Sequence, residues 1–183
     1  MGKGREHPPV KIIVAFTRRS GTSTEEIYHI LEEKFSVIER ISACFDFSCF
    51  TDYYSSEMGP QLEKDFIVFT ALEIPEALPE FKLWTNELED RYSRAGQRTI
   101  NLDPGYVCEA KVVLATTKNY THRLYLGKGI FGDVHLVYRN HTFNAQPWTY
   151  PDYKQPEIIN FFNLVRENYM QQLGEFYRRR GNN

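Results

Sequence analysis

The order of apolar patterns in the first hundred residues constrains the fold of this chain more than any other feature. Four short, β-branched or apolar runs are typical of strands: residues 10–16, 37–47, 66–71 and 98–102. Two segments carry apolar residues at steps of three and four, which is typical of amphipathic helices: residues 23–35 and 79–92. The order strand–helix–strand–strand–helix–strand is the ferredoxin-like order, which predicts an antiparallel sheet covered on one face by two helices.

The remaining pattern predicts a hairpin and a last helix. Asp103-Pro104-Gly105 predicts a turn, and the apolar run 106–116 fits either a buried strand or a short helix. Residues 122–139 alternate on both sides of a glycine-rich segment, and Pro156 can open a C-terminal helix. We therefore expect one α+β domain over residues 10–177, a mostly antiparallel sheet with an added β-hairpin and a C-terminal helix. Residues 1–9 and 178–183 are expected to be flexible tails.

Composition argues against several classes of partner. The formal net charge of −2 over 183 residues gives no electrostatic reason to expect binding to nucleic acid or to a membrane. No run reaches the roughly 18 apolar residues that span a bilayer, and the N-terminus lacks the apolar core of a signal peptide. Cys44, Cys49 and Cys108 cannot form a closed disulfide set. We expect a cytoplasmic protein with reduced, core-packed thiols; its cofactors and oligomeric state stay open.

Two familiar-looking patterns do not carry their usual meaning. Residues 127–132 spell GKGIFG, which matches GxGxxG, but a dinucleotide fingerprint needs a helix after the glycines and a strand follows instead. We expect a hairpin turn without phosphate contact. The five histidines lack metal-ligand spacing, so no metal site is predicted. His135 alternates with apolar neighbours and is expected to face solvent.

Three segments mix aromatic rings with charged side chains: residues 46–59, 101–123 and 148–154. Such loops can line a pocket, the rings supplying contact area and the charges orientation, although each segment alone also fits a purely structural role. The cations can hold an anion, and the carboxylates can act as acid, base or Mg²⁺ ligands if they converge. The candidate site residues are Asp52, Tyr53, Glu57, Asp103, Lys118, His122, Arg123, Tyr150 and Asp152.

The motifs FTDYYSSEMG, NLDPGYVCEAKVVLATTKNYTHRLYLGKGI and WTYPDYK follow one another in this order. With them the chain resembles, from Val10 to about Tyr169, a family of uncharacterised prokaryotic proteins, domain of unknown function 4416. The resemblance implies a small stand-alone bacterial or archaeal protein. It implies no activity and therefore no catalytic residues.

Two functional hypotheses follow. The first is binding of a small anionic molecule, such as a nucleotide or phosphorylated metabolite, with hydrolase or transferase activity as an extension. The second is a non-catalytic protein-interaction module that uses an aromatic-rich loop surface. Convergence of the three segments favours the first, and we expect Lys118, His122 or Arg123 to share a cavity with Asp103 or Asp152. We expect Arg123 to face the anion, so that Arg123→Ala abolishes ligand binding and barely lowers stability. If Arg123 is instead paired with Asp103 or Asp152, its removal lowers stability.

Overall fold

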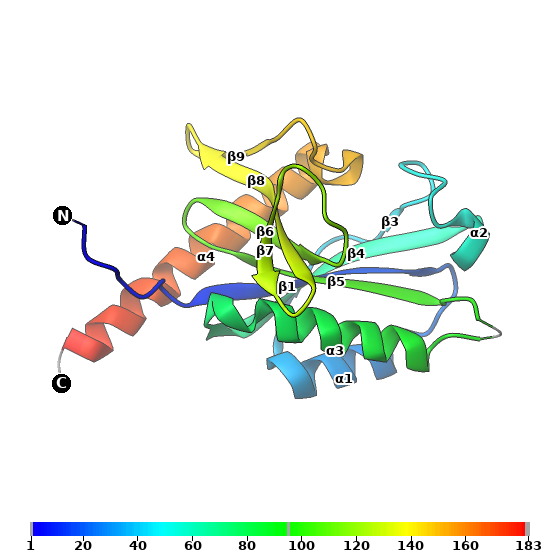
Figure 1. Cartoon of the computed structure of the whole chain (residues 1–183), viewed down its shortest axis with the longest axis horizontal. Coiled ribbons are helices and arrows are strands. Elements are labelled where there is room, and N and C mark those ends of the chain that lie inside the picture. The colour runs from blue at the N-terminus through cyan, green and yellow to red at the C-terminus, as the bar shows by residue number, and fades with distance from the viewer. Residues whose placement is uncertain (1, 95, 182–183) are drawn as a thin grey trace.

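The computed structural model describes residues 2–94 and 96–181, which form one open, antiparallel sheet of nine strands together with four α-helices (Figure 1). The strands are β1 (Val10–Arg19), β2 (Ile38–Ile41), β3 (Phe45–Asp46), β4 (Leu62–Glu73), β5 (Ile100–Val107), β6 (Lys111–Thr116), β7 (Arg123–Gly127), β8 (Ile130–Arg139) and β9 (Thr142–Ala145). The helices are α1 (Glu25–Phe35), α2 (Ser55–Met58), α3 (Leu78–Arg91) and α4 (Pro156–Gly181), with short 3₁₀ turns η1 (Pro75–Ala77) and η2 (Pro151–Lys154).

The sheet has the order β2-β4-β1-β5-β6-β8-β7, with β3 beside β4 and β9 beside β8. The α+β class, the single domain, the added hairpin and the C-terminal helix agree with the sequence. The ferredoxin-like order is not established for this sheet. In the sequence, β3 and α2 lie between β2 and β4, although β2 and β4 are neighbours in the sheet. Beyond β5 the sheet continues through β6, β8 and β7.

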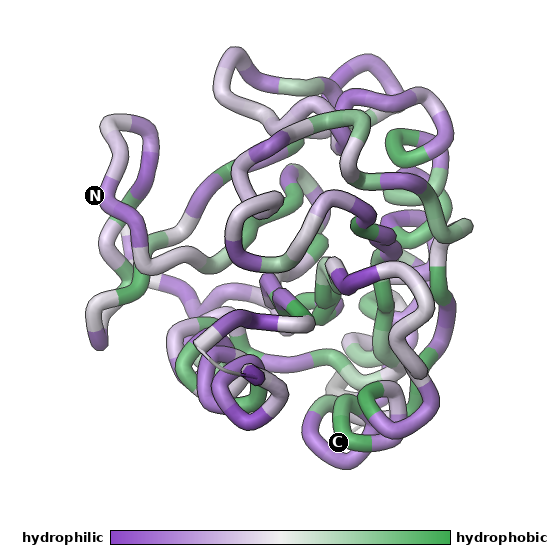
Figure 2. Tube along the Cα trace, turned by 90° about the vertical axis from the view of Figure 1, so that its right-hand side faces the viewer, coloured by the Kyte–Doolittle hydropathy of each residue, from purple (hydrophilic) through white to green (hydrophobic). Residues whose placement is uncertain are grey.

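β1 lies at the centre of the sheet and is buried on both faces because helices cover both. Ile12 and Val14 belong to the core shared with α1 and α3, whose Phe35 and Phe81 rings lie 5.0 Å apart. Ile13 belongs to the opposite core, which includes residues of α4. Hydrophobic stretches run through the interior of the trace, while many outer loops are hydrophilic (Figure 2). A central strand covered in this way reads as a continuous apolar run.

The turn predicted at Asp103-Pro104-Gly105 is wrong, because β5 runs straight through it. β1 pairs with β5 from Lys11↔Val107 to Arg18↔Ile100. β6 joins β5 only from Gly105 onward, so the β6 side of the strand has no partner at Pro104 and a residue without an N–H is tolerated there. The open alternative for residues 106–116 is thereby decided: this run forms the end of β5 and all of β6.

Smaller departures concern segment limits. The strand expected over residues 37–47 is split into β2 and β3. The hairpin turn is confirmed, with Lys128 (φ 53°) and Gly129 (φ 77°) forming the two-residue connection typical of β-hairpins. α4 continues to Gly181, past the boundary expected at residue 177, whereas residues 182–183 lie outside the described residues.

Two expectations about burial are corrected. Cys108 is buried, but Cys44 and Cys49 are exposed, so only one thiol is packed in the core. His135 is fully buried rather than solvent-facing, and its Nδ1 lies 3.1 Å from Asp133 Oδ1. A strand that is covered on both faces hides the alternation on which the sequence argument relied. None of the described helices combines the length and apolar character needed to cross a membrane.

Candidate functional site

The three segments that mix rings and charges meet at one cavity of about 270 Å³. Residues between Phe47 and Tyr54 form one wall, the β6–β7 connection contributes Lys118 and Tyr120, and the start of η2 closes the site. The lining residues are Thr17, Phe47, Phe50, Thr51, Tyr53, Tyr54, Lys64, Asp103, Lys118, Tyr120, Tyr150, Pro151 and Asp152. Because six of its thirteen lining residues are aromatic, we call this cavity the aromatic lobe.

A second cavity of about 140 Å³ adjoins the first, and we call it the polar lobe. The two lobes share Tyr53, Tyr54, Asp103, Lys118 and Tyr150. The polar lobe is otherwise lined by Lys82, Asn86, Arg98, Asn101, Leu114, Ala115, Thr116, Thr117 and Asp133. Together the lobes form one cleft. The expectation that Lys118 shares a cavity with Asp103 and Asp152 is confirmed.

A chain of ion pairs supports the polar lobe. Lys82 Nζ donates to Asp103 Oδ1 at 2.9 Å. Arg98 binds Glu57 with two hydrogen bonds, of 2.5 Å from Nε and 2.8 Å from Nη2, and donates from Nη1 to Glu89 Oε2 at 2.8 Å. Each cation therefore has a carboxylate partner, which is the condition for charged side chains to be tolerated at low exposure.

Asp103 is the ionised acceptor of the cleft. Burial alone would raise the pKa of its carboxyl, but Lys82, Lys64 and the amide of Asn101 outweigh burial and lower the pKa. Its side chain keeps 29% of its surface exposed, so a ligand can reach it. Glu89 behaves in the opposite way: it is buried, and desolvation raises the pKa of its carboxyl in spite of Lys82 and Arg98.

Lys64 and Asp152 form a buried pair in the aromatic lobe, with Nζ 2.6 Å from Oδ2. The ammonium also lies 4.5 Å from the centroid of the Phe47 ring, 5.3 Å from that of Phe66 and 5.0 Å from that of Tyr153. Cation–π contacts of this kind compensate part of the hydration that a buried ammonium loses. Lys64 therefore fixes η2 against β4 and brings Asp152 to the cleft.

Arg123 holds the cleft walls from behind and lines neither lobe. Its Nε donates to Asp133 Oδ2 at 2.8 Å, Nη1 to the Lys118 carbonyl at 3.0 Å and Nη2 to the Tyr150 hydroxyl at 3.0 Å. The expectation that Arg123 faces an anion in the cavity is therefore wrong, and the alternative of a buried pair applies, with Asp133 as the partner instead of Asp103 or Asp152. His122 also lies behind the wall, 3.3 Å from Asp133 and stacked on Trp148.

The structure thus divides the candidate residues. Tyr53, Asp103, Lys118, Tyr150 and Asp152 line the cleft. The others do not: Glu57 is bound by Arg98, Asp52 is exposed on the 47–59 loop, and His122 and Arg123 lie behind the wall.

Sequence reasoning missed several lining residues, above all Thr17, Lys64, Lys82, Arg98 and Asp133. The sequence signal that could have revealed some of them is a charged residue within or beside an apolar pattern, because such a charge is buried when the segment folds. Lys64 lies two residues before the apolar run of β4, and Lys82 falls on the buried face of α3. Within the described part of the chain, no group of three or more His, Cys, Asp or Glu side chains is arranged to hold a metal ion.

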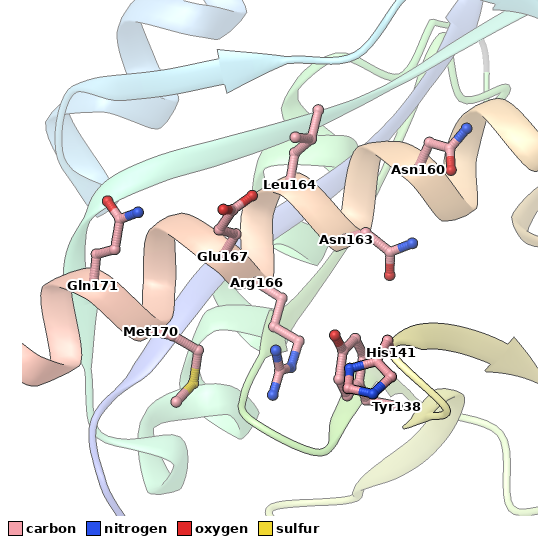
Figure 3. Close-up of a pocket in the computed structure, with 9 residues that line it drawn as sticks. All are labelled: Tyr138, His141, Asn160, Asn163, Leu164, Arg166, Glu167, Met170 and Gln171. Atoms are coloured by element: carbon pink, nitrogen blue, oxygen red, sulfur yellow. The ribbon is translucent and has the colours of Figure 1, made fainter.

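A larger and more open groove of about 690 Å³ runs along α4 (Figure 3). Three of its side chains, Tyr138, Asn163 and Arg166, connect α4 with the β8–β9 hairpin and the β5–β6 connection. The Arg166 guanidinium lies 3.5 Å from the centroid of the Tyr138 ring and donates to the Glu109 carbonyl at 2.6 Å. Asn163 donates to Thr142 at 2.8 Å and accepts from the Phe143 amide at 2.9 Å. We therefore regard the two-lobed cleft as the candidate site.

Comparison with known proteins agrees with the resemblance of the motifs. Residues 8–169 match the family described as Domain of unknown function (DUF4416). No curated protein and no solved structure matches the chain. The match covers both cleft lobes and every strand, so the chain belongs to the DUF4416 family.

Proposed function

We propose that this protein binds a small anionic molecule, a nucleotide or another phosphorylated metabolite, in the two-lobed cleft. The observation that carries the proposal is the position of Lys118, an exposed cation that lines both lobes. Its Nζ donates to the Tyr53 hydroxyl at 2.7 Å. A lysine held at the junction of two cavities, beside aromatic rings, is well placed to receive an anionic group.

Lys118 differs from the other lysines of the cleft in how its charge is used. Lys64 is paired with Asp152 and Lys82 with Asp103. In the described part of the chain no carboxylate lies within ion-pair distance of Lys118. Its positive charge is therefore available to a ligand, whereas the other two charges are neutralised within the protein.

The test is Lys118→Ala, studied by thermal shift and calorimetry against nucleotides, sugar phosphates and inorganic phosphate. A charge-assisted hydrogen bond contributes about 1.5–3 kcal/mol, so affinity for the best anion should fall roughly ten- to hundred-fold. The melting temperature without ligand should barely change because the side chain is exposed. Lys128→Ala, which removes an exposed lysine paired with Glu80, is the matched control and should bind normally.

Two results would overturn the proposal: no anion stabilises the wild-type protein at millimolar concentration, or Lys118→Ala binds as tightly as wild type. The first would favour the alternative, a non-catalytic interaction module. The exposed rings of Tyr53 (61%), Tyr120 (55%) and Tyr150 (41%) would then form part of a partner surface.

A hydrolase or transferase activity extends the main proposal, with ionised Asp103 as the available base.

The proposal also covers the setting of the protein. We place it in the cytoplasm of a prokaryote, acting on a small molecule and not on nucleic acid or a membrane. The net charge of −2 supports this, because a nucleic-acid-binding domain of this size normally carries a clear positive excess.

A further inference from the structure

We infer that the ligand is specifically a nucleotide, with its base in the aromatic lobe, its sugar hydroxyls donating to Asp103 and its phosphate on Lys118. This inference deepens the proposed function and rests on it. It follows from three features of the cleft: its division into two lobes, the chemistry of each lobe, and the two opposite charges at their junction.

The aromatic lobe requires a flat apolar part in the ligand. Phe47 and Phe50 line this lobe and not the polar one. Tyr53 and Tyr54 meet edge to face, with ring centroids 4.9 Å apart, and Tyr150 is held through its hydroxyl by Arg123. A sugar phosphate alone would leave the exposed rings of Tyr53 and Tyr150 in contact with water. A nucleobase would cover them by stacking, which is how proteins commonly bind bases.

Asp103 requires hydrogen-bond donors in the ligand. Its Oδ1 accepts from Lys82 and its Oδ2 accepts from the Asn101 amide at 2.8 Å, which leaves part of the capacity of both oxygens unused. An ionised carboxylate repels a phosphate, so the group beside Asp103 must carry O–H or N–H donors. The two hydroxyls of a ribose satisfy this condition.

The junction of the lobes sets the order of the ligand's parts. Asp103 and Lys118 both line both lobes, so a donor-bearing group and an anionic group can lie side by side there. Ring, hydroxyls and anion in close succession are the parts of a ribonucleotide. A phosphorylated metabolite without a ring would use only the junction and the polar lobe.

Calorimetry on the full chain with matched probes tests the inference. The probes are the four ribonucleoside 5′-monophosphates, their 2′-deoxy counterparts, ribose 5-phosphate and inorganic phosphate. At least one ribonucleotide should bind about tenfold or more tightly than ribose 5-phosphate, because only the nucleotide has a base to stack. The same ribonucleotide should bind several-fold or more tightly than its 2′-deoxy form, because Asp103 loses a donor.

Two variants assign these preferences to residues. Asp103→Asn keeps the shape of the side chain and should reduce the preference for ribose over deoxyribose. Phe50→Ala, in a residue that lines only the aromatic lobe, should weaken nucleotide binding and leave ribose 5-phosphate binding unchanged. Unfolding curves of both variants verify that they are folded, and for Asp103→Asn the ratio of ribo- to deoxyribonucleotide affinity is unaffected by any partial loss of stability.

The outcomes separate this inference from the proposed function. Equal binding of ribose 5-phosphate and every nucleotide overturns the nucleotide inference and leaves anion binding intact. Binding of no anion at all overturns both. A ribose preference that survives Asp103→Asn overturns the role given to Asp103.

Discussion

Arg123 joins three segments of the chain at one guanidinium. It is bonded to Asp133 on β8, to the Lys118 carbonyl and to the Tyr150 hydroxyl, and its side chain and that of Asp133 are only 1% and 2% exposed. Removing one partner of such a pair leaves the other charge buried without compensation. At the residue scale, then, the walls of the cleft depend on a side chain that does not touch its interior.

Arg123→Ala is therefore expected to lower the free energy of unfolding by about 3 kcal/mol, near the lower end of the range for buried pairs. The lower end applies because His122 and His135 also contact Asp133 and would partly compensate its charge. Urea denaturation followed by circular dichroism measures the change, with Lys118→Ala as the control that should unfold like wild type. A loss below about 1 kcal/mol together with abolished ligand binding would contradict this and return Arg123 to the site itself.

At the scale of elements, the contact between β5 and β6 depends on a residue without a side chain. A Cβ built on Gly105 would collide with the Val113 carbonyl oxygen and lie 2.8 Å from Leu114 Cδ2. Gly105→Ala should therefore separate the two strands and cost about 1–3 kcal/mol, as measured by urea denaturation. The matched control is Gly174→Ala in α4, where nothing lies within 4 Å; helix propensity should make it stabilising by up to about 1 kcal/mol. Equal stability of the two variants would contradict the prediction.

The two edges of the sheet are protected to different degrees. β2 carries the charges of Glu39 and Arg40, which discourage pairing with another chain. β7, at the opposite end, exposes Leu124 (71%), Tyr125 (64%) and Leu126 (42%) in succession. An edge strand with apolar side chains and no protecting charge is prone to self-association.

Leu124→Lys is accordingly expected to reduce association at high protein concentration while changing the free energy of unfolding by less than about 0.5 kcal/mol. Size-exclusion chromatography with light scattering measures the association. Leu164→Lys on α4 removes another exposed leucine away from any strand edge and should have no such effect. Equal behaviour of the two variants would mean that general surface hydrophobicity, and not the open edge, governs association.

The sequence predicted correctly those elements whose structure depends on residues close together in the chain. The periodicities of α1, α3 and α4 and the alternation around Lys128-Gly129 predicted those elements because each depends on neighbours in sequence. Asp103-Pro104-Gly105 was misread because its conformation depends on β1, about ninety residues earlier in the chain. The loop residues that line the cleft could be predicted, because each loop shows locally a mixture of aromatic and charged residues. Lys64 and Lys82 were missed because a single charge within an apolar pattern does not reveal its distant partner.

At the scale of the whole molecule, five carboxyl groups with shifted pKa values fall into two sets with opposite pH dependence. Burial raises the pKa of Glu89 and of Asp65, in spite of the cations that they contact. Arg98 lowers the pKa of Glu57, and the partners of Asp103 and Asp133 outweigh burial and lower theirs. The first set binds protons more readily in the folded state than in the unfolded state, and the second set less readily.

The melting temperature should therefore pass through a maximum in mildly acidic solution. As pH falls through the raised pKa values of Glu89 and Asp65, these carboxyl groups bind protons first in the folded state, so stability rises. The contribution of Glu57, Asp103 and Asp133 is complete above the ordinary carboxyl pKa of about 4 and is lost as pH falls through their lowered values. The melting temperature should rise as pH falls toward the ordinary carboxyl pKa of about 4 and should fall again below it, with 1 kcal/mol corresponding to about 2–4 °C for a domain of this size. Calorimetric scans from pH 3 to 8 measure the curve, and Glu89→Gln should flatten its rising part without moving the acid limb. A melting temperature that still increases toward pH 3 would show that the paired carboxylates around the cleft do not stabilise the fold.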